Sequence, residues 1–306
     1  MTTTRPIDSN ASRAWLNEKV SREASAHHPL IQEVGKRLVS HAEWIKLDPN
    51  VWLEWRSSVG GDAVRNAFTQ RFQNAQHHHW EPTHALWQEV QDERSKGSWM
   101  KQTQAWLNSK LKPVQPWVGD LSPSCVDFIV SNLSLHHEPE PERTFAHWAQ
   151  ALRPEGVVLF SALGPDTLRE LHDLYLDMNW AAPAHPLIDM HDLGDMLVHS
   201  GFSDPVVDME RLVLTYSDAQ TFLKDLRALG RNMSPNRFAA MRGRKFLSDL
   251  LAALENRKTE TPGGRFSMTF EVIYGHAFKA RAKEPKSSEV KLDLDSVRAQ
   301  LKKPRI

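Results

Sequence analysis

The residues best placed for chemistry follow an apolar run at positions 126–130. Asn132 comes just after this run, and a side-chain amide at the carboxyl end of a buried strand can meet a cofactor or a substrate. His136 and His137 follow closely. A histidine near a strand end is more often a hydrogen-bonded structural residue than a catalyst, and His137 has the better position of the two for function.

The sequence contains none of the short motifs of common hydrolases, nucleotide-binding loops or zinc centres. HExxH, GxSxG, P-loop and CxxC patterns are all absent, so these classes lack support. Three consecutive histidines, His77, His78 and His79, occupy a predicted strand. Because neighbouring residues of a strand point to opposite faces, they cannot all reach one metal ion, and we expect no metal site.

The elements that must position these residues lie in segment 124–171. The apolar run at 126–130 is followed by an amphipathic stretch with Phe145 and Trp148 on one side, then by a turn and a second apolar run at 157–160. This order predicts a strand, a helix and a second strand. Such βαβ units build parallel sheets, which bind ligands at the carboxyl ends of their strands.

The same segment resembles strands four and five of the class I S-adenosylmethionine-dependent methyltransferases, since LRPEGVVLFSAL is similar to their L-x-P-G-G pattern. The segments SNLSL, LGPDTLREL, DMHDLGDMLVHSGF and YGHAFK resemble the malonyl-acyl carrier protein O-methyltransferases of biotin synthesis. The resemblance covers residues 30–280. It implies an α/β, Rossmann-like fold with a seven-stranded, mostly parallel sheet, and S-adenosyl-L-methionine as the methyl donor.

In the resembled family, the first strand ends in an acidic residue and a glycine loop that approaches the donor closely. On this pattern Glu54 takes the acidic position, and Gly60 and Gly61 fall at the end of the loop. Arg56 and Ser58 stand at the first two glycine positions, where a side chain costs on the order of 1 kcal/mol if positive φ is required. Either Arg56 turns outward and the loop still binds the donor, or donor binding has been lost and the fold serves another purpose.

The resemblance implies roles for three further residues at the donor site. Glu81 takes the position of the acid that binds the ribose hydroxyls, and Asp120 that of an aspartate that contacts the adenine amino group. Asn132 closes the fourth strand beside them.

The implied reaction transfers a methyl group to the free carboxylate of a malonyl thioester. With a reference pKa near 4, that carboxylate is already ionised at pH 7 and needs no general base. A cationic or imidazole side chain would therefore serve to hold the carboxylate in place. His137, Arg169 and Arg227 are the candidates.

A helical insertion is predicted at residues 217–258, between two strands. It holds nine Lys and Arg against four Asp and Glu, in a chain with 38 residues of each sign. A solvated helical face is the simpler interpretation, and a lid that attracts an acidic acyl carrier protein is the functional one. Residues 1–29 are expected to be a disordered or helical N-terminal segment, and residues 281–306 a disordered tail.

The balanced charge gives no indication of a nucleic-acid or membrane partner. No apolar run approaches the roughly 20 residues that span a bilayer, and the first residues lack the apolar core of a signal peptide, so we expect a cytoplasmic protein. The alternative to an active enzyme is a weakened or inactive methyltransferase-like protein acting as a partner or regulatory module. A different activity on the same fold is also open.

Overall fold

The computed structural model describes residues 7–17, 27–46, 48–95, 117–238, 240, 242–258 and 264–281. Its centre is a seven-stranded sheet in the order β3-β2-β1-β4-β5-β7-β6. The strands are β1 (Val51–Trp55), β2 (Gln76–Glu81), β3 (Trp117–Val118), β4 (Val126–Ser131), β5 (Leu152–Leu163), β6 (Phe202–Tyr216) and β7 (Phe266–Lys279). The pairs among β1 to β5 are parallel, and β7 is antiparallel to both β5 and β6. The predicted seven-stranded, mostly parallel α/β sheet is confirmed.

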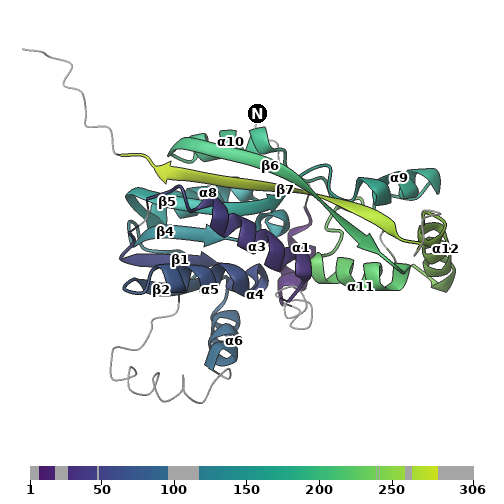
Figure 1. The fold of residues 1–306 in the computed structure, drawn as a ribbon, viewed down its shortest axis with the longest axis horizontal. Coiled ribbons are helices and arrows are strands. Elements are labelled where there is room, and N and C mark those ends of the chain that lie inside the picture. Colours follow the sequence, from purple (N-terminus) through teal and green to yellow (C-terminus); the bar gives the residue numbers. More distant parts are fainter. Residues whose placement is uncertain are drawn as a thin grey trace, which may run out of the picture.

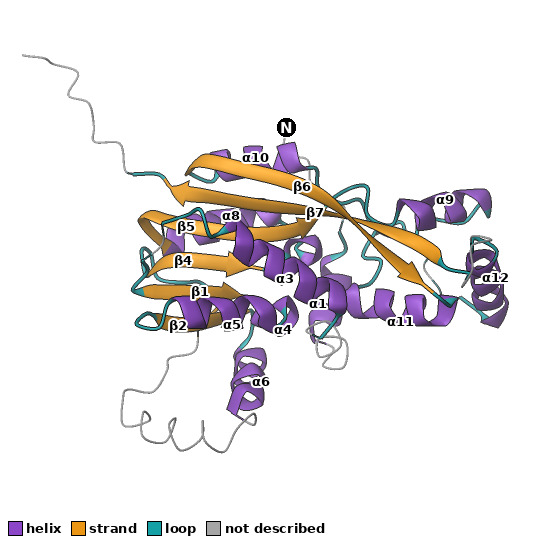
Figure 2. Cartoon of the chain, viewed as in Figure 1, coloured by secondary structure: helices purple, strands orange, loops and turns teal. Residues whose placement is uncertain are grey.

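Helices cover both faces of the sheet (Figures 1 and 2). The helices are α1 (Ser9–Asn17), α3 (Pro29–His41), α4 (Ser57–Gly60), α5 (Asp62–Arg71), α6 (His84–Ser95), the 3₁₀ helix η1 (Leu135–His137), α8 (Pro141–Ala151), α9 (Arg169–Asp177), α10 (Met190–His199), α11 (Ala219–Leu229) and α12 (Arg244–Glu255).

The two faces of the sheet bury alternate residues of each strand, as the period of two requires. Trp52 and Phe128 belong to one core cluster, which α3 and α5 cover. Leu53 and Ile129 belong to the other, which α8 and α10 cover. The two layers hold the ends of β1 and β4 rigidly side by side, which fixes the loops that follow those strands.

The predicted helical insertion is helical over α11 and α12, within the described part of residues 217–258. Figure 1 shows these two helices and α9 grouped beyond the carboxyl ends of the central strands, around the long β6–β7 pair. Leu229 of α11 and Leu254 of α12 belong to the same core cluster as the buried residues of α3. The insertion therefore lies on the side of the molecule where ligands of this fold type bind.

The N-terminal segment contributes α1 and the start of α3 to the described structure. The predicted tail at residues 281–306 lies outside the described residues apart from Arg281. Among the described helices, none combines the length and the apolar character needed to cross a bilayer.

Candidate functional site

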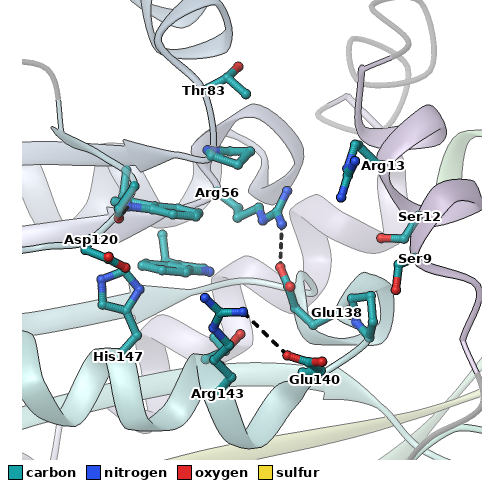
Figure 3. A pocket seen from close by; sticks show the side chains of 16 residues that line it. Ser9, Ser12, Arg13, Arg56, Thr83, Asp120, Glu138, Glu140, Arg143 and His147 are labelled. Carbon is teal, nitrogen blue, oxygen red and sulfur yellow. Dashed lines mark hydrogen bonds and ion pairs between the residues drawn. The ribbon is translucent and has the colours of Figure 1, made fainter.

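The main cavity lies at the carboxyl ends of β1, β2 and β3 and beside the segment that follows β4 (Figure 3). We call it the strand-end cavity; its volume is about 590 Å³. Trp55 and Trp80 line it with indole rings stacked at 3.7 Å between centroids. Trp80 also donates from Nε1 to the carbonyl oxygen of Gly119 at 2.8 Å. The stacked pair provides a flat aromatic surface of the kind on which a base can stack.

Helix α1 closes one side of this cavity with Ser9, Ser12 and Arg13 (Figure 3). The Ser12 hydroxyl donates to the carbonyl oxygen of His137 at 2.6 Å. Trp15 lies on the His137 ring, with 3.9 Å between centroids. These contacts join the first described helix to the segment after β4 and hold it as one wall of the cavity.

Arg56 follows β1 directly and has left-handed backbone geometry, with φ of 54°, as its place at a glycine position predicts. Its Nη2 lies 2.6 Å from Oε1 of Glu138, and the two side chains are only 8% and 12% exposed. The guanidinium carbon also lies 5.7 Å from the centroid of the Trp80 ring. Arg56 therefore does not turn outward into solvent; it lines the cavity and carries a buried ion pair across it (Figure 3).

Glu81 is fully buried and turned toward the loop after β1. Its carboxylate accepts hydrogen bonds from the Ser57 hydroxyl (3.2 Å), the Ser58 amide (2.8 Å) and the Ser58 hydroxyl (2.9 Å). Burial raises the pKa of Glu81, opposed by these hydrogen bonds and by the charge of Arg56. The side chain does not line the strand-end cavity, so its predicted contact with ribose hydroxyls stays a prediction.

Glu54 and Asn132 hold the framework around the cavity. Glu54 is buried at the end of β1, with Oε2 at 3.3 Å from Nε2 of His77. Asn132 donates from Nδ2 to the carbonyl oxygens of Ile31 (3.0 Å) and Gly60 (2.7 Å). Its Oδ1 accepts from the Ser161 hydroxyl at 2.8 Å. Asn132 thus ties α3, the glycine loop and β5 together at the end of β4.

Asp120 lies on the wall of the strand-end cavity beside His147 (Figure 3). The His147 Nε2 accepts from the Leu121 amide at 2.9 Å. Burial lowers the pKa of His147, and the charge of Asp120 opposes this shift. A carboxylate at this edge can accept a hydrogen bond from an exocyclic amino group, and the contact of Asp120 with an adenine stays a prediction.

Two residues of the loop after β1 were predicted to approach the donor. Gly61 precedes α5 with φ of 76°, a geometry that favours glycine. A side chain at Gly60 would place its Cβ 3.5 Å from the carbonyl oxygen of Asn132. Neither glycine lines the strand-end cavity, and their contact with a donor stays a prediction.

A second cavity of about 230 Å³ lies beneath α11, and we call it the lid cavity. Its walls are mostly apolar and come from α11, the stretch from the end of β5 into α9 (residues 163–171), the loop at residues 183–187 and β7. They comprise Leu163, Leu168, Leu171, Pro183, Ala184, Leu187, Leu223, Leu226, Leu229 and Phe270, with His136, Arg227 and Arg231 among the polar members.

The three predicted carboxylate-holding residues occupy different places. His137 is buried between Trp15 and Gly230 and lines neither cavity, although its neighbours His136 and Glu138 each line one. Arg227 lines the lid cavity. Arg169 is 54% exposed, contacts Glu170 at 3.4 Å and lines neither cavity. Of the three residues only Arg227 lines one of the two cavities, and the role of each in holding the carboxylate stays a prediction.

The sequence analysis did not single out Trp55, Trp80 and Glu138, which shape the strand-end cavity. Trp55 and Trp80 are register partners on neighbouring parallel strands. Two tryptophans at the last positions of two adjacent predicted strands are a signal that can be seen in the sequence. Glu138 gives no such signal, because only the folded chain brings it to Arg56.

Comparison with known proteins shows to which family the chain belongs. A family profile described as "Methyltransferase domain" matches residues 26–204. The malonyl-[acyl-carrier protein] O-methyltransferase of Gallionella capsiferriformans is 32% identical over 275 residues, or 89% of this chain and 91% of that protein. The corresponding protein of Nitrosospira multiformis is 31% identical over 82% of each chain. Malonyl-[acyl-carrier protein] O-methyltransferase 1 of Coxiella burnetii is 39% identical over 56% of this chain, a region spanning 61% of that protein. The chain belongs to the methyltransferase domain family, in its Rossmann-like, S-adenosylmethionine-dependent class.

Proposed function

We propose that the protein transfers a methyl group from S-adenosyl-L-methionine to the free carboxylate of a malonyl thioester on acyl carrier protein, the reaction of the biotin pathway. The observation that carries this proposal is the similarity to the Gallionella capsiferriformans malonyl-[acyl-carrier protein] O-methyltransferase over 89% of the chain. An alignment over that share of the chain must include at least part of the helical insertion at residues 217–258. The similarity to this relative therefore extends beyond the donor-binding half of the chain.

The residues of the strand-end cavity fit a purine nucleoside. The Trp55–Trp80 pair offers a stacking surface, and Asp120 offers an acceptor at the cavity edge. Trp80, Asp120 and Glu138 are the residues that would hold the donor. When bound, S-adenosylmethionine supplies the electrophilic methyl group.

The protein's own contribution to this reaction is positioning and the exclusion of water. A carboxylate is already nucleophilic at pH 7, so no side chain has to remove a proton. Helix α1 forms one wall of the cavity and is held there by the contacts of Ser12 and Trp15 with His137. Fixing two reactants in a shielded site contributes up to roughly 7–11 kcal/mol to lowering the barrier.

The test uses the purified full-length protein, S-adenosylmethionine and malonyl-acyl carrier protein, with intact-mass spectrometry of the carrier. The carrier should gain the mass of one methylene group. Butyryl-acyl carrier protein is the matched control, because it lacks the free carboxylate and should stay unmodified. An unmodified malonyl carrier, together with no binding of S-adenosylhomocysteine in calorimetry, would refute the proposal.

A further inference from the structure

The lid cavity is separate from the strand-end cavity, and the reaction described above leaves it without a ligand. Ten apolar side chains, seven of them leucines, form most of its wall, and they come from four parts of the chain. A ligand that fills it must present methyl and methylene groups to these walls, because an unpaired charge inside an apolar cavity carries a large desolvation cost.

The cationic groups of this cavity lie at its rim. Arg227 and Arg231 both line the cavity and both are exposed. Lys224 is also exposed and lies three residues before Arg227 on α11, so the two side chains are neighbours on the helix surface. Among the described residues Arg227 makes no ion pair. Arg231 donates to the carbonyl oxygens of Arg227 and Gly230. The rim therefore suits an anionic group at the outer end of an apolar ligand.

The inner wall of the lid cavity is the segment that also borders the strand-end cavity. His136 of η1 lines the lid cavity, and Glu138, two residues later, lines the strand-end cavity. His185 holds this partition in place: its Nε2 donates to the carbonyl oxygen of His136 at 3.0 Å, and its Nδ1 accepts from the Met233 amide at 3.3 Å. A chain that enters at the rim and fills the lid cavity thus directs its inner end toward η1.

We propose that the lid cavity binds the phosphopantetheine arm of the carrier-bound thioester, with its phosphate at the rim formed by Arg227 and Arg231. The arm combines a phosphate at the carrier end with a dimethyl group, methylenes, a hydroxyl and two amides along its length, and Thr167, His185 and Asn232 are the polar lining residues that could pair with the latter. That order matches a cationic rim, apolar walls and an inner end beside η1. The assignment rests on the proposed function, because it takes the acyl carrier thioester as the substrate.

The test is calorimetric titration of the full-length protein with 4′-phosphopantetheine and with pantetheine, which lacks the phosphate. Wild type should bind the phosphorylated compound about tenfold more tightly, the contribution expected of a charge-assisted contact. Arg227→Ala should abolish that difference. Arg244→Ala is the matched control, since it removes an exposed cation of α12 that does not line the cavity, and it should retain the difference.

A second pair of variants tests the apolar wall. Leu226→Phe narrows the lid cavity and should weaken binding of both compounds about tenfold or more, while S-adenosylhomocysteine binds as in wild type. Leu247→Phe, at an exposed position of α12 outside the cavity, should change neither. Normal binding of phosphopantetheine to both Leu226→Phe and Arg227→Ala would overturn the assignment.

The outcomes also separate this assignment from the proposed function. If the protein methylates malonyl-acyl carrier protein with an unchanged KM in Leu226→Phe and Arg227→Ala, the function stands and the lid-cavity assignment is wrong. If phosphopantetheine binds as predicted while the carrier is never methylated, the binding site stands and the methyltransferase proposal is wrong.

Discussion

Replacing Arg56 and Ser58 together by glycine probes the loop after β1 most directly. Arg56→Gly removes a guanidinium that lines the strand-end cavity and relieves a left-handed backbone of φ 54°. Ser58→Gly keeps the amide that donates to Glu81 but removes the hydroxyl that donates to Oε2 at 2.9 Å. The double variant therefore enlarges the cavity and leaves Oε2 of Glu81 without its hydroxyl partner. Glu81 does not line the wild-type cavity, so a ligand would reach this oxygen only through the space that the two side chains vacate.

Stability and ligand affinity should change in opposite directions. Removing one partner of a buried ion pair costs about 3–5 kcal/mol, and glycine recovers about 1 kcal/mol at a left-handed position. The free energy of unfolding should fall by about 2–4 kcal/mol, which lowers Tm by on the order of 10 °C. Adding Glu138→Gln removes the stranded carboxylate and should restore part of this loss.

The affinity for S-adenosylhomocysteine should rise about tenfold, since one hydrogen bond to a charged group contributes about 1.5–3 kcal/mol. Calorimetry measures the affinity, and a thermal melt measures the stability. Arg153→Ala is the control, because it also breaks an arginine–carboxylate pair, with Asp127 at 2.6 Å, but at the opposite ends of the strands. It should lower Tm and leave the affinity unchanged. A folded double variant that binds no more tightly than wild type would refute the reasoning about Arg56 and Glu81.

Two further predictions concern stability. Burial and the neighbouring His77 lower the pKa of His78 to about 4 from a reference value of 6.5. The unfolded chain therefore takes up this proton first as the pH falls, so stability should decrease between about pH 6.5 and pH 4. His78→Phe, which can still stack on Trp117, should flatten that decrease in urea melts, and an unchanged slope would contradict the assignment. Gly275→Ala should lower the free energy of unfolding by about 1–3 kcal/mol because a Cβ there overlaps the ring of Phe160. Gly194→Ala in α10, where the nearest atom is 3.8 Å away, should instead stabilise by about 0.5–1 kcal/mol; a thermal melt that does not separate the two glycine variants would count against this view of the core.

The sheet was predictable because its signal is local. The apolar runs of β4 and β5 and the amphipathic helix between them lie within 40 residues of sequence, and their periodicity alone predicts a βαβ unit. The left-handed geometry of Arg56 was predictable for a similar reason, since a single position of a loop pattern decided it.

The interior of the site was not predictable in the same way. The partners of Glu81 are the serines of the loop after β1. A glutamate at that position looks the same in the sequence whether its carboxylate binds a ribose or the loop of its own chain. The buried pair of Arg56 and Glu138 depends on how two loops meet. The lid cavity needs four separate parts of the chain, so no single stretch of sequence carries its pattern.

Helix α1 has one consequence for how the molecule is made. The amide of Asp8 donates to the carbonyl oxygen of Met233 at 2.8 Å, and its carboxylate pairs with Arg237 at 2.8 Å. Ile7 and Trp15 share a small apolar cluster with Val59 and Met233. During synthesis on the ribosome, this helix emerges well before Met233 and Arg237, which lie more than 200 residues later in the sequence. The α1 side of the strand-end cavity would consequently be completed late, after most strands of the sheet that supports it have been synthesised.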